Sequence, residues 1–128
     1  MNNTHPAPPG AINLAEKLRA IPETWMPHLL ARVDGHEVKL VRIQGEFVWH
    51  SHPDADEMFL VMEGAFRMEF RDRVVPLGVG EMMVVPAGTE HRPVADAECA
   101  ILLFERAGVV NTGDATPGAL TRAGTPTL

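Results

Sequence analysis

Short apolar runs dominate the chain from His28 onward. Each run is about four to eight residues long, is rich in Val, Ile, Leu, Met and Phe, and is followed by a turn sequence, which predicts β-strands. Asp34-Gly35 is expected to form a two-residue hairpin turn, because this pair readily adopts positive φ angles. The strands are expected at 29–33, 37–43, 46–52, 57–63, 65–71, 73–77, 82–85 and 99–105.

One helix is expected, over residues 13–20. Asn13 can cap its first turn, Leu14 and Leu18 give it an apolar side, and Pro22 ends it. The helix precedes all of the predicted strands, so the pattern as a whole is all-β with a short N-terminal helix.

Two of the predicted strands are apolar on both faces. They are 58–62 and 100–104, in which every residue is hydrophobic. One face of such a strand can line the inside of a barrel, and the other face has to be covered as well. A homodimer interface is the expected cover.

Length and charge restrict the class of protein. A chain of 128 residues is the size of one domain, with a barrel core expected over about 28–106. The Pro- and Gly-rich ends, 1–12 and 107–128, are expected to form arms that are either flexible or wrapped on the body or a partner. The net charge of −6 opposes binding to nucleic acid, and no apolar run approaches the roughly 20 residues of a membrane helix. A single cysteine and a start without a basic, apolar leader predict a cytoplasmic protein.

The first candidate site lies between residues 45 and 64. In a strand, residues two apart point to the same side, so His50 and His52 are expected to converge while Trp49 and Ser51 face away. Pro53 ends this strand, and Glu57 opens the next one, from which its carboxylate can turn back toward the imidazoles.

The second candidate site lies between residues 80 and 91. An apolar strand ends at Pro86, a turn through Gly88 reverses the chain, and His91 starts the return. The pair His50 and His52, or His91 alone, is weak support for a metal site. The two stretches together form a pattern that is much less frequent by chance.

Together the two stretches resemble the paired motifs of the cupin superfamily. The first reads Gly-x4-His-x-His-x4-Glu-x6-Gly over 45–64, and the second reads Gly-x5-Pro-x-Gly-x2-His over 80–91. The resemblance covers roughly residues 38–105 and is greatest to small single-domain cupins described as mannose-6-phosphate-isomerase-like, whose tail the stretch 105–114 also resembles. It implies that the chain 1–128 is one all-β domain, a double-stranded β-helix or jelly-roll cupin barrel.

The resemblance also implies a metal site. The residues that match the motif ligands are His50, His52, Glu57 and His91, and they are expected to hold one divalent metal inside the barrel. Three imidazoles and one carboxylate suit Mn, Fe, Co, Ni, Cu or Zn and disfavour Ca and Mg. Ala95 stands where the second motif usually carries Asn, a residue that is not a ligand.

Two classes of function remain open from the sequence. One is a metal-dependent enzyme of the isomerase-like, lyase or dioxygenase type, and the other is a non-catalytic module that binds a metal or a small ligand. A dication with one carboxylate ligand keeps a net positive charge and favours polar or anionic substrates such as a sugar phosphate, a uronate, or a hydroxy or keto acid. A further acid or base group in the pocket would favour the enzyme, and the sequence identifies no such catalytic residue.

The remaining candidates are expected to have structural roles. Cys99 opens an apolar strand and is interpreted as a small core residue. His5, His28 and His36 are expected to take no part in chemistry.

Overall fold

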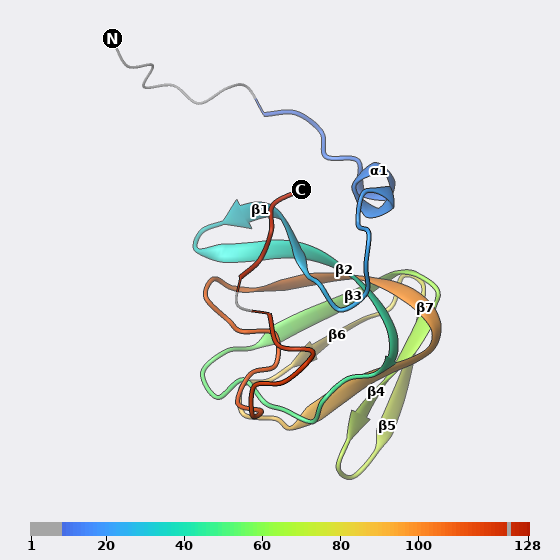
Figure 1. Cartoon of the computed structure of the whole chain (residues 1–128), viewed down its shortest axis with the longest axis vertical. Helices are drawn as coiled ribbons and strands as arrows, with labels where there is room; N and C mark the ends of the chain where they lie inside the picture. The colour runs from blue at the N-terminus through green and yellow to red at the C-terminus, as the bar shows by residue number, and fades with distance from the viewer. Residues whose placement is uncertain (1–8, 123) are drawn as a thin grey trace.

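The computed structural model describes residues 9–122 and 124–128 and shows one short helix ahead of an antiparallel β-structure (Figure 1). The predicted all-β fold with a short N-terminal helix is confirmed. No described helix has the length and apolar character needed to cross a membrane. The elements are α1 (Leu14–Arg19), β1 (His28–Val33), β2 (His36–Glu46), β3 (Glu57–Glu63), β4 (Ala65–Phe70), β5 (Val74–Gly78), β6 (Met82–Val85) and β7 (His91–Arg106).

Strand β7 connects the two halves of the structure. Its C-terminal part lies between β2 and β3, in the strand order β1-β2-β7-β3-β6, and its N-terminal part pairs with β4, which in turn pairs with β5. The register of β2 against β7 shifts between Ile43 and Gly45, and such irregularities allow a strand to bend. The strands therefore curl around a common interior (Figure 1).

Three local expectations have different outcomes. The Asp34-Gly35 hairpin is confirmed, with φ angles of 47° and 79° at the two turn residues. The strand expected at 46–52 is wrong, because β2 ends at Glu46 and His50 forms only an isolated bridge with His91. The strand expected at 99–105 is longer than predicted and begins at His91.

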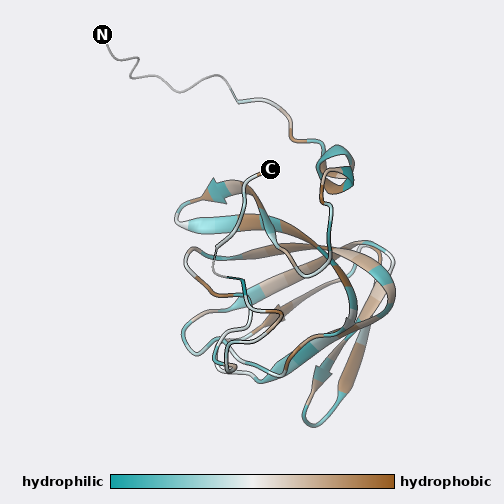
Figure 2. Ribbon diagram, viewed as in Figure 1, coloured by the Kyte–Doolittle hydropathy of each residue, from teal (hydrophilic) through white to brown (hydrophobic). Residues whose placement is uncertain are grey.

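Helix α1 covers part of the outer sheet face. Asn13 caps it by accepting a hydrogen bond from the Glu16 amide at 2.9 Å, and Leu18 packs with Ile21, Leu40 and Ala100 in a second hydrophobic cluster. Part of the outer face that was expected to need a second copy is thus covered by this chain's own helix. Figure 2 shows hydrophobic and hydrophilic residues both distributed along the strands.

The C-terminal segment packs on the body of the protein. It crosses one side of the barrel and ends beside β1, where Leu29 donates to the Pro126 carbonyl at 2.8 Å and Leu128 donates to the Leu29 carbonyl at 3.0 Å (Figure 1). Of the expected arm over 1–12, residues 1–8 lie outside the described part of the chain.

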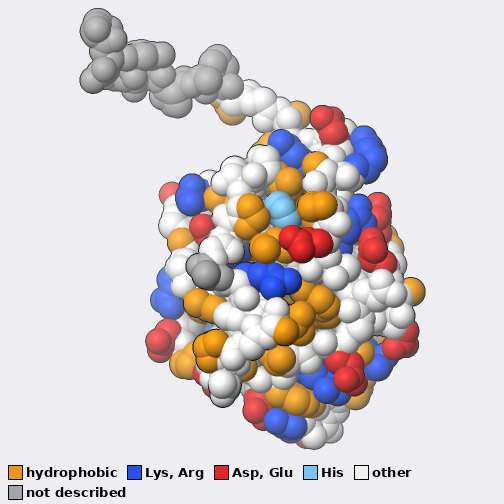
Figure 3. Space-filling view, viewed as in Figure 1, with side chains coloured by type: hydrophobic (Ala, Val, Ile, Leu, Met, Phe, Trp, Pro, Cys, Tyr) orange, Lys and Arg blue, Asp and Glu red, His pale blue; other side chains and the backbone are white. Residues whose placement is uncertain are grey.

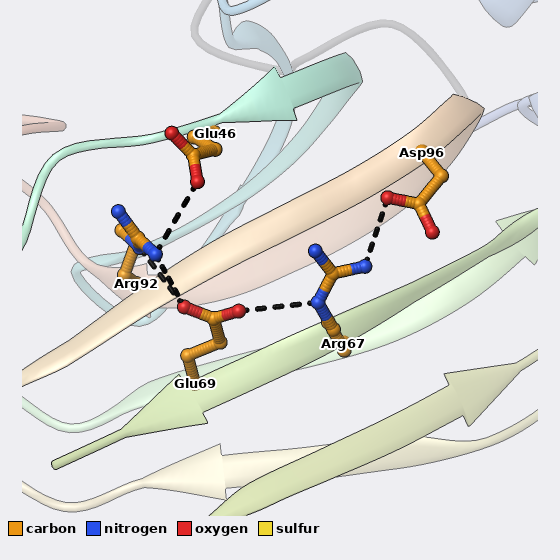
Figure 4. Close-up of polar contacts among 5 residues, drawn as sticks. All are labelled: Glu46, Arg67, Glu69, Arg92 and Asp96. Carbon is orange, nitrogen blue, oxygen red and sulfur yellow. Dashed lines mark hydrogen bonds and ion pairs between the residues drawn. The ribbon is translucent and has the colours of Figure 1, made fainter.

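A charged network crosses the outer surface of β4 and β7. Glu69 accepts from Arg92 at 2.6 Å and from Arg67 at 3.1 Å, while Arg67 also pairs with Asp96 and Arg92 with Glu46 (Figure 4). Exposed pairs contribute little individually, about 0–1 kcal/mol. Because Arg92 directly follows His91, this network helps to fix the strand that carries the histidine.

Candidate metal centre

The four predicted ligands meet inside the barrel. The candidate ligand atoms of His50, His52, Glu57 and His91 all lie within 4.8 Å of one another, and all four residues are buried. Glu57 is the first residue of β3 and His91 the first of β7, whereas the other two lie in the segment between β2 and β3. The group could therefore hold a metal ion.

Backbone contacts orient two of the imidazoles. The Nδ1 atom of His50 lies 2.9 Å from the Val48 carbonyl, and that of His91 lies 2.8 Å from the Thr89 carbonyl. A carbonyl accepts only from a protonated nitrogen, so each ring carries its proton on Nδ1. Nε2 is then left as the free donor atom for a metal.

The loop around Gly88 and strand β7 hold the histidine segment from one side. His50 and His91 exchange backbone hydrogen bonds of 3.1 and 2.9 Å, and the Gly88 amide donates to the His52 carbonyl at 3.0 Å. The two-residue alternation expected for a strand is thus retained locally. The side chains of His50 and His52 point into the ligand group. Trp49 points away from it, and the guanidinium carbon of Arg71 lies 3.9 Å from the centroid of the Trp49 ring.

The C-terminal segment holds the same histidine segment from the other side. Asp114 binds Ser51 through its carboxylate, and the Asp114 amide donates to the Ser51 carbonyl at 3.0 Å. Gly113 has φ +53°, and a Cβ at this position would collide with the Ser51 carbonyl oxygen. The close approach therefore requires glycine.

The chemistry of the donor set fits a metal ion. His52 Nε2, His91 Nε2 and Glu57 Oε1 are buried, and none has a hydrogen-bond partner within the described ranges. Glu57 Oε1 lies 3.3 Å from His52 Nε2 and 3.5 Å from His91 Nε2. Unpartnered buried polar atoms are rare, and a cation at their meeting point would satisfy all three.

The protonation states also suit metal binding. Burial, reinforced by the neighbouring His91, lowers the pKa of His50 to about 4, so this imidazole is neutral. Three nitrogens and one carboxylate oxygen match divalent first-row transition metals better than Ca²⁺ or Mg²⁺.

A cavity of about 260 Å³ adjoins the ligand group, with His50 and Glu57 in its wall. Seen from the side crossed by the C-terminal segment, hydrophobic and charged side chains lie next to one another on the molecular surface (Figure 3). Inside, the wall is mainly apolar, formed by Trp25, Val41, Ile43, Phe47, Phe59, Ile101 and Leu103.

A buried row of three carboxyl groups lines the same cavity. Glu105 pairs in register with Glu37 on one side and with the ligand Glu57 on the other, so the three side chains lie in one row across β2, β7 and β3. Lys39 lies 3.0 Å from Glu105 Oε1 and 3.3 Å from Glu37 Oε1. Burial and the charge of Glu57 raise the pKa of Glu105 to about 9.

Sequence reasoning missed these residues, although a weak signal was present. Glu37 and Lys39 alternate with the inward-facing Val41 and Ile43, and Glu105 continues the buried series from Cys99 through Leu103. A charged residue in the period-two series of an inward face indicates a buried polar group. In β2 both faces mix charged and apolar residues, so the inward face could be recognised only from the structure.

Comparison with known proteins identifies the family. The family model described as a cupin domain matches residues 39–104. The chain belongs to the cupin family. It is 44% identical to a cupin-2 domain protein from Shewanella frigidimarina whose crystal structure superposes with a TM-score of 0.73, covering 74% of this chain and 93% of that one.

Two further relatives agree with the assignment. A Neisseria meningitidis protein of known crystal structure is 33% identical to this chain. The two superpose with a TM-score of 0.71, over 77% of this chain and 100% of that one. The Bacillus subtilis protein YdbB is 35% identical over 81 residues, which are 62% of this chain and 72% of that relative. The jelly-roll cupin fold expected from the paired motifs is confirmed.

The other candidate residues of this cupin lie away from the ligand group. Cys99 is buried in the core, and burial raises the pKa of its thiol to about 11, which suits a packing role. His28 contacts the Met26 carbonyl, and His36 stacks on Phe104. Ala95 is fully buried within β7, so the replacement of the usual Asn leaves the strand intact.

Proposed function

We propose that this cupin is a mononuclear metal-dependent enzyme that acts on a small polar or anionic substrate. His50, His52, Glu57 and His91 hold one divalent transition metal, which when bound acts as a Lewis acid on a substrate oxygen. The observation that carries the proposal is the buried Glu105 beside Glu57, in the wall of the same cavity.

Glu105 has the geometry of an acid or base group. Lys39 fixes its Oε1 atom at 3.0 Å, whereas Oε2 is buried and has no hydrogen-bond partner among the described residues. In this proposal Oε2 takes a proton from a bound substrate or returns one to it. A second contact to Glu37 holds Lys39 in place, and the apolar walls exclude bulk water.

The wall composition narrows the substrate class. Hydroxylated sugars need many free hydrogen-bond partners. The wall is apolar at residues such as Trp25, Phe47 and Phe59, and its charged residues Glu37, Lys39 and Glu105 already pair with one another. Among the candidate classes, a hydroxy or keto acid therefore fits better than a sugar phosphate or a uronate.

A matched pair of variants tests the proposal. Metal-loaded wild type, Glu105→Gln and the exposed control Glu63→Gln are incubated with hydroxy acids, keto acids and sugar phosphates, and turnover is followed by NMR. We expect Glu105→Gln to keep its metal and lose about 10²- to 10⁴-fold in rate, the usual contribution of an acid–base group. Tight binding without turnover in wild type would instead support the alternative, a non-catalytic binding module.

We also propose a homodimer formed through the outer sheet face. Val84 of β6, Met58 of β3 and Phe104 of β7 are neighbours in register, and Met82, Leu60 and Leu102 form the adjoining row. Val84 and Met82 are 52% and 55% exposed. A second copy of this chain placed face to face would cover both rows.

The organisation and location of the chain complete the proposal. We propose that residues 1–128 form a single domain. Limited proteolysis tests this, and one stable core fragment is expected.

A cytoplasmic location is proposed from the single cysteine, and fractionation of the cells that express the protein tests it.

A further inference from the structure

Arg122, in the segment after β7, forms part of the cavity wall. Its backbone is well fixed, because the Arg122 amide donates to Asn111 Oδ1 at 2.9 Å and Asn111 Nδ2 donates to the Leu120 carbonyl at 2.8 Å. The hydroxyls of Thr112 and Thr121 also lie 3.0 Å apart. These contacts cross-link two turns of the C-terminal segment and hold the arginine beside the cavity.

The guanidinium of Arg122 has little compensation from the protein. Nη1 donates to the Ala119 carbonyl at 3.1 Å, but Nε is buried without a hydrogen-bond partner, and no carboxylate lies within ion-pair distance in residues 9–122 and 124–128. Lys39, the other cation in the wall, has Glu105 and Glu37 as partners. Arg122 is half-buried, and its buried Nε–H lacks an acceptor, so a bound anion would supply both an acceptor and a counter-charge.

The charge balance of the cavity favours such an anion. With His50 counted as neutral, the wall carries three carboxylates and two cations, a net charge of −1. A divalent metal changes this sum to +1. The three carboxylates lie together in the row across β2, β7 and β3, whereas Arg122 comes from a different segment.

We propose that Arg122 binds the carboxylate of a small organic acid with an apolar body. The body lies against walls that include Trp25, Val41 and Phe47, and the cavity of about 260 Å³ has room for a ligand on the order of nine water volumes, at about 30 Å³ each. The planar guanidinium presents parallel N–H donors that match a carboxylate. This inference rests on the proposed function for the metal and specifies the class of ligand that enters the same site.

Binding of two acids and their neutral matches tests the proposal. Benzoate and 4-methyl-2-oxopentanoate are compared with the corresponding amides by calorimetry, on metal-loaded and on metal-free wild type. At least one acid is expected to bind 10-fold or more tightly than its amide to the metal-loaded form. Arg122→Met should weaken the binding of that acid about 10- to 100-fold, while the exposed control Arg19→Met leaves it unchanged.

A second measurement does not depend on how the variant folds. The ¹⁵Nε–¹Hε resonance of Arg122 in wild type should shift when the acid is added and should not shift with the amide. If neither acid binds more tightly than its amide, or if the resonance does not move, the assignment of Arg122 is wrong. Metal content measured on the same samples separates this failure from failure of the metal site itself.

Discussion

Asp114 holds Ser51 through both oxygens of its carboxylate. Oδ1 accepts from the Ser51 amide at 2.6 Å and Oδ2 accepts from the Ser51 hydroxyl at 2.8 Å. Ser51 lies between His50 and His52, so a residue 63 positions further along the chain fixes the backbone that carries two candidate ligands. The hydrogen bonds from Ser51 lower the pKa of Asp114, so this carboxylate is ionised at neutral pH.

Removal of that carboxylate is expected to weaken metal binding without removing a ligand. In Asp114→Ala the Ser51 amide loses its acceptor and the two histidines become less well ordered, so the metal should dissociate faster. Chelator competition at pH 7.5 measures the effect. Asp54→Ala, an exposed acidic residue of the nearby loop, should behave as wild type, and equal dissociation rates in the two variants would exclude a positioning role for Asp114.

Loss of a ligand is expected to have a larger effect. His52→Ala and His91→Ala each remove one donor of four, so elemental analysis should find most of the metal gone from an expected content of up to one ion per chain. His36→Ala is the exposed control and His28→Ala the buried one, because both residues lie outside the ligand group. Equal metal content in all four variants would refute the assignment of the ligands.

The fold and the ligand group follow closely from local sequence signals. The Asp34-Gly35 turn and the strand that starts at Glu57 depend on neighbouring residues, and the paired motifs indicate the four residues whose side chains meet as a candidate metal-binding group. The strand expected at 46–52 is absent because this segment is held instead by the Gly88 loop and by Asp114. The second of these contacts is too distant in the sequence to leave a local pattern.

The remaining residues of the cavity depend on tertiary structure. Glu37, Glu105 and Glu57 become neighbours only through the register of three strands. Arg122 reaches the cavity because the C-terminal segment folds back, and its Thr-, Gly- and Pro-rich sequence is equally typical of a mobile tail. Sequence patterns therefore predict the metal ligands and leave the groups around them undetermined.

His50 is expected to make the metal-free protein less stable in acid. The pKa of His50 is about 4 in the folded chain against 6.5 for the free group, so the unfolded chain takes up the proton first as the pH drops. His50 therefore leaves the free energy of unfolding unchanged above about pH 6.5 and lowers it by about 3 kcal/mol between about pH 6.5 and 4. Urea unfolding of wild type and His50→Gln at pH 7, 6 and 5 measures it as the difference between the two proteins, because the raised pKa of Glu105 changes the stability of both in the opposite direction. Relative to His50→Gln, wild type should lose free energy of unfolding as the pH falls, and an unchanged difference between pH 7 and pH 5 would contradict the prediction.

The proposed dimer predicts which surface change produces a monomer. Val84→Lys places a charge in the exposed apolar row on β6 and should shift the protein to a monomer in light scattering at micromolar concentration. Val79→Lys is the control, since Val79 is 66% exposed in the turn before β6 and outside the two rows. Cys99→Ser should remain dimeric, because the thiol is buried in the core. A wild-type protein that is itself monomeric would rule out the interface.

Glu57→Gln separates an enzyme from a binding module. Glutamine keeps a donor oxygen and nearly the same volume, but it removes one negative charge from the ligand group. Anions that contact the metal should therefore bind at least as tightly as in wild type. If the protein is an enzyme, its rate should fall at least 10-fold, because the charge at the metal sets how strongly a bound oxygen is polarised and how readily an anionic product leaves. Calorimetry and NMR turnover on variants loaded with the same metal measure both quantities. Unchanged turnover together with unchanged binding in Glu57→Gln would show that the reaction does not depend on this carboxylate. Ligand binding that is unaltered when the metal is removed would refute a metal-centred function.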